Sequence, residues 1–261
     1  MQLSGKRALV TGSTGGIGLA IARALGLEGA NVALNGFGSP EEIRRMEDEL
    51  SGLRGTTVKH FAADLATADA VTDLVRRVEA ALGGIDILVN NAGIQHVAPI
   101  ESFPAERWDA VLAVNLSAAF HAVRASLPGL RARGWGRIIN VASVHGLVGS
   151  AHKAAYVAAK HGLIGLTKVI ALETAREPIT CNAICPGWVD TPLVRAQIDT
   201  RARASGQSAE VEAEALICEK MPSGAFVTPE QLAALVVFLC SDAAAQIRGA
   251  ALPVDGAWTA Q

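Results

Sequence analysis

The sequence predicts an α/β protein with a doubly wound, seven-stranded parallel sheet and helices on both faces of the sheet. Seven short runs rich in strand-forming residues alternate with helical patterns along almost the whole chain of 261 residues. Strands that are separated by helices cannot form hairpins, so right-handed crossovers must join them in parallel. Glycines follow the first strand where the chain turns into a helix, as in doubly wound sheets that bind ligands at the carboxyl ends of their strands.

The predicted elements follow one another regularly. The strands are RALVTG (7–12), NVALNG (31–36), TVKHFAAD (57–64), IDILVNNAG (85–93), RIINVAS (137–143), ITCNAICPG (179–187) and ALPVDG (251–256). The helices lie between them at about 16–28, 40–53, 67–82, 105–127, 153–175 and 228–240. No linker, repeat or low-complexity tract interrupts this order, so we expect a single domain over residues 1–261.

One segment, between Pro186 and Pro229, departs from the alternation. It is charged, rich in alanine and too long for an ordinary connection in a compact domain. Because it follows the carboxyl end of a strand, we expect it to form a helical lid over a substrate site at about 190–223. The alternative is a surface excursion that only extends the fold.

Charge and cysteine content exclude several kinds of partner. The chain has 23 basic and 25 acidic residues and a net charge of −2, with no run of one sign, so neither nucleic acid nor a membrane surface is expected as a partner. The four cysteines are too few for a disulfide framework. Cys181 and Cys185 lack the second pair that a zinc site needs, so no metal is expected.

The start of the chain predicts the location of the protein. A strand pattern begins within six residues of Met1, which leaves no room for a signal peptide, and no apolar run approaches the length of a bilayer span. A cytoplasmic location is therefore expected.

The glycine-rich turn after the first strand predicts a dinucleotide site of the Rossmann type. In LVTGSTGGIGLAIARAL (9–25), Gly12 permits a tight turn, Gly16 lets the backbone approach a pyrophosphate, and Gly18 lets the helix pack close to the strand. The free N–H groups at the start of the helix can then bind the anion. An ordinary glycine-rich turn is the alternative.

The end of the second strand indicates which dinucleotide is bound. An acidic residue there would bind the ribose 2′-hydroxyl and an arginine would bind a 2′-phosphate, but the chain has Asn35, Gly36, Phe37 and Gly38. No cation is available, so NAD is favoured over NADP by exclusion. Phe37 can cover the adenosine, and Asp64 can bind the adenine amino group or only cap the helix that follows.

The only tyrosine of the chain, Tyr156, lies four residues before Lys160 in a helical pattern, so the two share one helix face. A phenol is too weak an acid to act readily as a base at neutral pH unless a nearby cation favours the phenolate. Ser143, at the end of the preceding strand, can hydrogen-bond a carbonyl or alkoxide oxygen. These three residues predict catalysis, whereas an unrelated surface pair is the alternative.

Together these motifs identify a family. The stretches TGxxxGxG (11–18) and NNAG (90–93), with Asn115, Ser143 and YxxxK (156–160), resemble the short-chain dehydrogenase/reductase family along essentially the whole chain. The resemblance implies hydride transfer between a nicotinamide and a carbinol carbon. It implies Tyr156 as the general base, Ser143 as the group that positions the substrate oxygen, Lys160 as a ribose ligand that lowers the tyrosine pKa, and Asn115 as the holder of a water in a proton relay.

The resemblance also implies a set of cofactor contacts. PGWVDTP (186–192) resembles the stretch that covers the nicotinamide. The implied contacts are Gly12, Thr14, Gly16, Ile17, Gly18, Phe37, Asp64, Leu65, Asn91, Ala92, Gly93, Val114, Tyr156, Lys160, Pro186, Gly187, Val189 and Thr191.

Donor side chains near the predicted site indicate the substrate. Gln95, His145 and Lys153 lie at strand ends or on the helix of the tyrosine, and Gln197 lies in the predicted lid. Such a pocket suits a small carboxylate whose charge must be paired away from water, although Lys153 and Gln197 can equally be solvated surface residues.

Within the family, NNAGIQH, SVHG, HKAAYVAAK, CPGWVDTPL and VDGAWTA resemble the members that act on 3-hydroxybutyrate. This implies NAD-dependent oxidation of (R)-3-hydroxybutyrate to acetoacetate, a pocket walled by Trp188 and Trp258, and substrate contacts from Gln95, Ser143, His145, Lys153, Tyr156 and Gln197. Another small hydroxy-acid dehydrogenase or an NADPH-dependent 3-oxoacyl reductase of the same family is the alternative. A non-catalytic nucleotide-sensing or scaffold protein would have no need of Asn115, Ser143, Tyr156 and Lys160 together.

The helix that carries Tyr156 also suggests an oligomer. The run 154–172 is apolar around more of its circumference than one buried face requires. Its outer side is expected to pack against another subunit, and the family resemblance implies a homotetramer formed through this helix and the one near 105–127.

Overall fold

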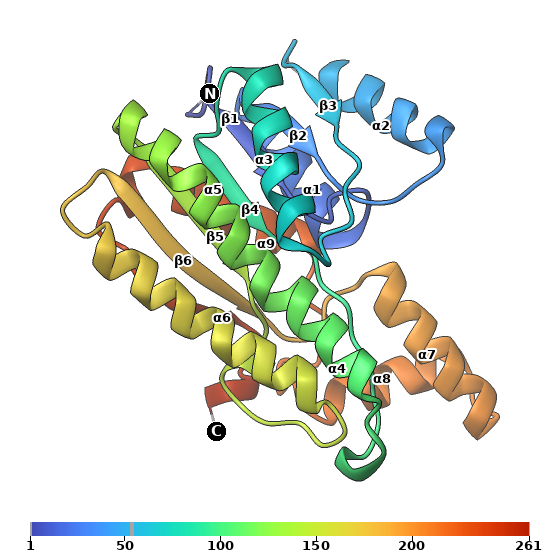
Figure 1. Cartoon of the computed structure of the whole chain (residues 1–261). Helices are drawn as coiled ribbons and strands as arrows, with labels where there is room; N and C mark the ends of the chain where they lie inside the picture. The colour runs from blue at the N-terminus through green and yellow to red at the C-terminus, as the bar shows by residue number, and fades with distance from the viewer. Residues whose placement is uncertain (1, 53–54, 261) are drawn as a thin grey trace.

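The computed structural model describes residues 2–52 and 55–260 and contains the seven-stranded parallel sheet that the sequence predicts (Figure 1). The strands are β1 (Arg7–Val10), β2 (Asn31–Leu34), β3 (Val58–His60), β4 (Ile87–Asn90), β5 (Gly136–Val141), β6 (Ile179–Pro186) and β7 (Ala251–Val254). Their order across the sheet is β3-β2-β1-β4-β5-β6-β7, and every neighbouring pair is parallel. The order reverses between β1 and β4, and a doubly wound sheet opens a crevice at that point.

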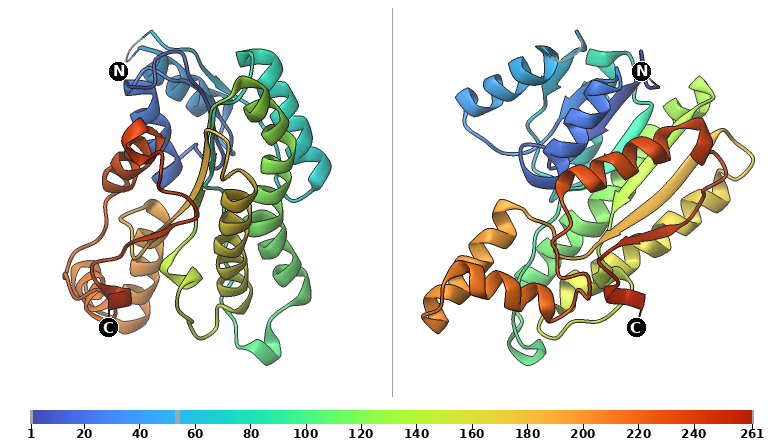
Figure 2. Two further views of the ribbon diagram at one scale, coloured as in Figure 1. Left: turned by 90° about the vertical axis from the view of Figure 1, so that its left-hand side faces the viewer. Right: turned by 180° about the vertical axis from the view of Figure 1, so that it is seen from behind.

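The helices are α1 (Gly16–Leu27), α2 (Pro40–Gly52), α3 (Ala68–Leu82), α4 (Ala105–Leu112), α5 (Ala118–Arg133), α6 (Ala154–Glu173), α7 (Pro192–Ser205), α8 (Ala209–Cys218) and α9 (Pro229–Cys240). Figure 2 shows α1 and α9 on one face of the sheet, with α3, α5 and α6 on the other. Side chains alternate along each strand. Val10 therefore packs with α1 and α9, whereas its neighbour Leu9 packs with α3 and α5. The sheet is buried on both faces, which explains its nearly continuous apolar strands.

The helix predicted at 105–127 differs from the observed one in two ways. A π-helical segment, Ala113–Ser117, separates α4 from α5, and α5 continues through Pro128 to Arg133. Pro128 removes only one backbone donor, and Leu130 beyond it is completely buried in the core. Burial of this side chain outweighs the local preference to end the helix.

Two helices correct the statement that no apolar run approaches a bilayer span. Residues 105–133 and 154–173 are long and apolar enough to cross a membrane by length and composition alone. Both nevertheless form part of the layered fold: α5 packs against α3 and β5, and α6 packs against β6 and α4. Their hydrophobicity is that of helices which cover a buried sheet.

The segment between β6 and α9 forms α7 and α8, which project from the body of the protein (Figure 1, orange). Thr191 caps α7 by accepting from the backbone of Val194, and an isolated parallel bridge between Val189 and Val227 closes the base of the excursion. A helical insertion at about 190–223 is therefore observed, and its function as a lid stays a prediction.

Candidate active site

The glycine-rich turn lets three segments of backbone approach each other closely. Gly12 has a φ of +60°, and a Cβ there would lie 2.8 Å from the Cα of Ala92. A Cβ on Gly18 would overlap the carbonyl oxygen of Gly12. No L-residue with a side chain fits either position without moving the backbone. The roles predicted for Gly12 and Gly18 in tight turning and close packing agree with this geometry.

The start of α1 is open to an anion. Its N-cap residue is Gly15, which offers no side-chain oxygen, and the first turn contains no acidic residue. The first N–H groups of the helix therefore remain available. They face a groove of about 710 Å³. Of the predicted cofactor residues, this groove is lined by Gly12, Thr14, Gly16, Ile17, Phe37, Asp64, Leu65, Asn91, Ala92, Gly93, Val114 and Thr191.

At the far end of this groove, Asn35 serves the fold and not a ligand. Its amide donates to the carbonyls of Phe61 (3.1 Å) and Ala63 (3.3 Å), and the side chain is buried. Phe37 is 77% exposed and free to cover a ligand. Asp64 accepts from the backbone N–H of Ala66 (3.1 Å). This is a local capping contact of the kind given above as the alternative to adenine binding. None of the residues that line the groove is a lysine or arginine.

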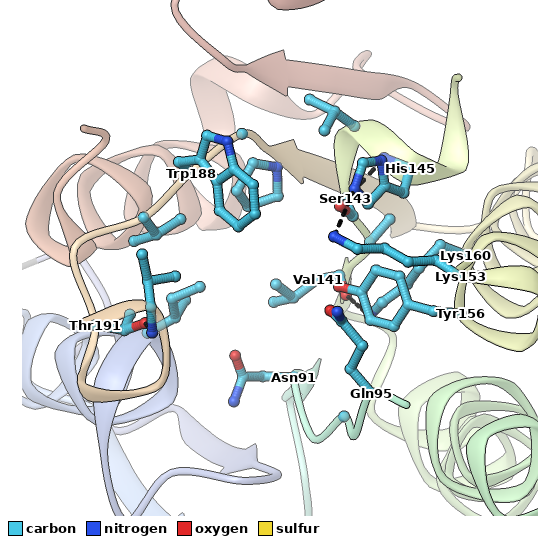
Figure 3. A pocket seen from close by; sticks show the side chains of 18 of the residues that line it. Asn91, Gln95, Val141, Ser143, His145, Lys153, Tyr156, Lys160, Trp188 and Thr191 are labelled. Carbon is cyan, nitrogen blue, oxygen red and sulfur yellow. Dashed lines mark hydrogen bonds between the residues drawn. The ribbon is translucent and has the colours of Figure 1, made fainter. Parts of the chain in front are cut away.

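A second cavity, of about 200 Å³, adjoins the groove and shares with it Ile17, Asn91, Gly93, Ile94 and Thr191. All of the predicted substrate residues line it: Gln95, Ser143, His145, Lys153, Tyr156, Trp188, Gln197 and Trp258. Lys160, Pro186, Gly187 and Val189 line it as well. Figure 3 shows Tyr156, Lys153 and His145 on one side of this cavity and Thr191 with Trp188 on the other. The structure therefore brings together residues from five separate stretches of the sequence.

Tyr156, Lys160 and Ser143 meet on one wall of this cavity. The Lys160 ammonium donates to the carbonyl oxygen of Val141 (2.7 Å) and lies 5.5 Å from the centroid of the Tyr156 ring. Ser143 lies two residues after β5 and accepts from the backbone of His145 (3.2 Å), which orients its hydroxyl group. The i,i+4 spacing of Tyr156 and Lys160 places both on the inner face of α6, as predicted.

Burial is the main influence on the pKa values of Tyr156 and Lys160. Burial raises the pKa of the Tyr156 phenol, and the nearby Ser143 hydroxyl acts in the opposite direction. Burial also lowers the pKa of Lys160 to about 8, so the amine stays mostly protonated at pH 7. Burial is the larger of these two effects on Tyr156, and the Lys160 ammonium donates to Val141, so the predicted lowering of the tyrosine pKa by Lys160 stays a prediction.

Beside the phenol, a lysine and a histidine form a compact polar group. Nζ of Lys153 lies 3.4 Å from Nε2 of His145 and 5.1 Å from the ring centroid of Trp188. The His145 ring packs edge to face against the rings of Tyr156 and Trp258, with ring centroids 6.1 Å and 5.4 Å apart, respectively. Burial and the Lys153 charge lower the pKa of His145 to about 4, so the imidazole is neutral at pH 7 and Nε2 can accept from the ammonium. Burial also lowers the pKa of Lys153.

The neutral state of His145 leads to a testable effect of pH on stability. Above pH 6.5 the imidazole is neutral in both the folded and the unfolded chain, whereas between pH 6.5 and about 4 only the unfolded chain takes up the proton. Stability is therefore lost as the pH falls through this window. We expect the free energy of urea unfolding to fall by about 2–3 kcal/mol more for the wild type than for His145→Gln between pH 7 and 4.5.

His161→Gln removes an exposed imidazole from α6 whose effect on the His145 pKa is smaller than those of burial and Lys153, and it serves as the control: it should lose nearly as much stability as the wild type. Equal losses in wild type and His145→Gln would contradict a neutral His145.

Two predicted residues lie outside the groove and the cavity. Gly18 packs beneath the turn. Asn115 lies in the π-helical segment, where its amide accepts from the N–H of Ile94 (2.8 Å) and donates to the carbonyl of Ile94 (3.0 Å). Asn115 thus holds the loop that follows β4, and its water relay stays a prediction. A π-helix at this point is consistent with a functional site.

Sequence reasoning missed several apolar lining residues. Ile94, Val144 and Val194 line the substrate cavity. The first two are neighbours of predicted site residues, which is the signal that would have found them. Val194 lies in α7, and nothing in its local sequence indicates that it faces the site.

Comparison with known proteins finds relatives along the chain. Residues 6–202 match the family described as short chain dehydrogenase. The chain is 57% identical over 260 residues to D-beta-hydroxybutyrate dehydrogenase from Cupriavidus necator, covering 100% of both chains. It is 52% identical over 256 residues to D-beta-hydroxybutyrate dehydrogenase from Rhizobium meliloti, covering 98% of this chain and 99% of the relative. The structure of L-sorbose reductase from Gluconobacter frateurii, complexed with NADPH and L-sorbose, aligns with a TM-score of 0.95 and 33% identity over 100% of both chains.

Proposed function

Because the chain belongs to the short chain dehydrogenase family, we propose that it oxidises (R)-3-hydroxybutyrate to acetoacetate, reversibly and with NAD as the cofactor. The observation that carries the choice of substrate is the Lys153–His145 pair, which lies in the same small cavity as Tyr156 and Ser143. In 3-hydroxybutyrate the hydroxyl lies two carbons from the carboxylate. One molecule would therefore present its carboxylate to Lys153 and its hydroxyl to Tyr156 and Ser143. D-beta-hydroxybutyrate dehydrogenases that share 57% and 52% of their residues with this chain support the same choice.

The reaction needs a base for the substrate hydroxyl and a group that holds its oxygen. Tyr156 accepts the hydroxyl proton during oxidation and returns it during reduction. Ser143 donates to the same oxygen and holds it beside the phenol. Lys160, which stays mostly protonated at pH 7 because its pKa is about 8, provides positive charge beneath Tyr156 as the phenolate forms.

The chain's own residues fit a nicotinamide dinucleotide. The groove has an uncapped helix N-terminus at the phosphate position and a glycine turn that a side chain would obstruct. A bound dinucleotide would supply the acceptor for the hydride of the carbinol carbon. Thr191 and Ile17 line both the groove and the substrate cavity, so they would hold the nicotinamide end where the two spaces join.

The preference for NAD over NADP rests on the adenosine end of the groove. A 2′-phosphate would need a cation, and none of the lining residues supplies one. Asp64 lines the same end and would repel a second negative charge. A solved relative that is 33% identical holds NADPH, so the fold alone does not exclude NADP and the residues at the adenosine end must decide.

The substrate carboxylate binds at the lysine side of the cavity. The Lys153 ammonium pairs with the carboxylate, and Gln95 and Gln197 supply amide donors from the loop after β4 and from α7. Neutral His145 accepts from Lys153 and so directs its ammonium without adding a second charge. A 3-oxoacyl reductase would need an open, neutral pocket for a thioester, whereas this cavity is lined by two lysines and two tryptophans.

The experiment that tests this function measures NADH oxidation by the purified protein. Acetoacetate is compared with neutral ketones of similar size, with longer 3-oxo acids and with an acetoacetyl thioester. We expect acetoacetate to have the highest kcat/KM and NADPH to be a poor substitute for NADH. A preference for the thioester with NADPH would instead identify a 3-oxoacyl reductase.

Exposed apolar side chains on the outer helices favour a homotetramer. Phe120 of α5 is 46% exposed, and Val169 and Leu172 of α6 are 50% and 77% exposed. Their burial against other subunits would remove apolar surface from water. Light scattering at micromolar concentration should give four times the mass of the chain, and a monomer would contradict this proposal.

We also propose a cytoplasmic location, which the free Cys181, Cys185, Cys218 and Cys240 favour. Recovery of the protein in a membrane or secreted fraction after cell fractionation would contradict it.

A further inference from the structure

We propose that Asp255 is a positioning residue that holds the C-terminal turn, residues 255–260, and thereby fixes Trp258 as a wall of the substrate cavity. The inference rests on the proposed function for its substrate, but its geometry involves residues to which the mechanism assigns no part. Asp255 lies just after β7 and lines neither the groove nor the substrate cavity. Its role would be to set the width of that cavity and hence the chain length of the acid that fits.

The Asp255 carboxylate collects the donors of the turn. Oδ1 accepts from the N–H of Ala257 (3.1 Å), and Oδ2 accepts from the N–H (2.9 Å) and the hydroxyl (2.6 Å) of Thr259. Asp255 is only 8% exposed. Hydrogen bonds to a buried charge are stronger than those between neutral groups. A single side chain therefore closes this segment on itself.

The turn has a backbone conformation that needs such support. Ala257 has a φ of +71° and is one of only two non-glycine residues with positive φ among the described residues. This region is unfavourable for alanine, because its Cβ crowds the backbone. Residues held in this conformation persist only where their surroundings impose it, and they cluster at functional sites. The next residue along the chain is Trp258, whose direction the turn sets.

Trp258 is the side chain through which the turn reaches the site. Its indole packs edge to face against His145 at 5.4 Å and lies 6.1 Å from the Trp188 ring. Both neighbours line the same cavity. The aromatic wall opposite the catalytic phenol therefore depends on a segment whose own anchor is Asp255.

The turn is also connected to the base of the α7–α8 excursion. The N–H of Ser223 donates to the carbonyl of Gly256 (3.1 Å), and a Cβ on Gly256 would overlap the Ser223 hydroxyl. Nearby, the sulfur of Met221 accepts from the backbone N–H of Trp188 (3.3 Å). Figure 1 shows the end of the chain (red) at the same end of the molecule as α7 and α8 (orange). The segment 221–223 therefore contacts both the turn that carries Trp258 and the backbone of Trp188.

Thr259→Val removes one donor to Asp255 and keeps the shape of the side chain, whereas Thr259→Ser keeps the hydroxyl and is the matched control. For Thr259→Val we expect the KM for acetoacetate to rise roughly five- to tenfold, with kcat within about twofold and the KM for NADH unchanged. The kcat/KM of a six-carbon 3-oxo acid relative to acetoacetate should also rise, because the wall can yield. Asp255→Asn should raise the KM for acetoacetate and the relative kcat/KM of the six-carbon acid further than Thr259→Val does.

A double-mutant cycle identifies the route of the effect. In a Trp258→Ala background, Thr259→Val should produce no further change in chain-length preference. Unchanged preference in folded Thr259→Val, or an equal loss of turnover with every substrate, would overturn the proposal, since either result describes a turn with only a structural role.

A fluorescence measurement separates this inference from the proposed function. Acrylamide should quench tryptophan emission more strongly in Thr259→Val than in Thr259→Ser, and the difference should vanish when Trp258 is replaced by phenylalanine. Equal quenching of the two variants would overturn the positioning role, whatever the substrate. If the wild type failed to reduce acetoacetate while the quenching difference persisted, the proposed substrate would be wrong and the positioning role would stand.

Discussion

Tyr156→Phe should reduce turnover by about 10²- to 10⁴-fold while the protein stays folded and still binds NADH. The substitution removes only the phenolic oxygen. The ring keeps its edge-to-face contact with His145, and the apolar neighbours of the ring on α4 and α6 remain in place. Because this chain has no other tyrosine, no neighbouring phenol can take over the proton transfer. Steady-state kinetics with acetoacetate and NADH measure the loss.

Two controls are needed for this variant. Its thermal unfolding midpoint should stay close to that of the wild type, and NADH titration should give an unchanged dissociation constant. Ser143→Ala should lower kcat less than Tyr156→Phe, because a lost oxygen contact leaves the base in place. Near-native turnover of Tyr156→Phe would remove Tyr156 from the mechanism and leave the glycine groove as a binding site without chemistry.

Lys153→Ala should lower kcat/KM for acetoacetate by about 10- to 150-fold, which is the usual effect of losing a hydrogen bond to a charged group. Lys153 is the ammonium that lies in the substrate cavity beside His145 and Trp188. NADH binding should change little, because Lys153 does not line the cofactor groove. Kinetics with acetoacetate and with a neutral ketone of similar size should show that the charged substrate loses its advantage.

Lys153→Met separates the charge from the packing of the lysine stem. It keeps an extended apolar chain over Trp188 and should lose nearly as much activity toward acetoacetate as Lys153→Ala. Lys59→Ala, which removes an exposed lysine from β3, is the matched control and should behave as wild type. Loss of NADH affinity with an unchanged KM for acetoacetate would show that Lys153 does not bind the carboxylate.

Much of the site could be predicted because its chemistry is written in short stretches of sequence. The turn at Gly12, Gly16 and Gly18 depends on local backbone geometry that only glycine allows. The pairing of Tyr156 with Lys160 follows from the period of one helix. The place of Ser143 in the site follows from the rule that ligands bind at the carboxyl ends of parallel strands, because Ser143 lies two residues after β5. Each of these inferences needs knowledge of one or two adjacent elements only.

Other features depend on contacts between distant segments. Val194 lines the cavity because the first turn of α7 lies beside it, and no local pattern in α7 indicates this. Helix α5 passes through Pro128 because the burial of Leu130 outweighs a local breaker. The raised pKa of Tyr156 arises from burial by surrounding elements, whereas the adjacent lysine alone suggested the opposite direction.

The sequence by itself determined the parallel α/β fold and the residue types available for the chemistry, because strand and helix periods, glycine turns and helix spacing are local properties of the chain. Only the tertiary structure decided how those residues combine: Lys153 beside His145, the two tryptophans as a wall, and Asp255 as the anchor of the last turn. The physical reason is that burial and electrostatic coupling depend on distances through space, and packing sets those distances between segments that lie far apart along the chain.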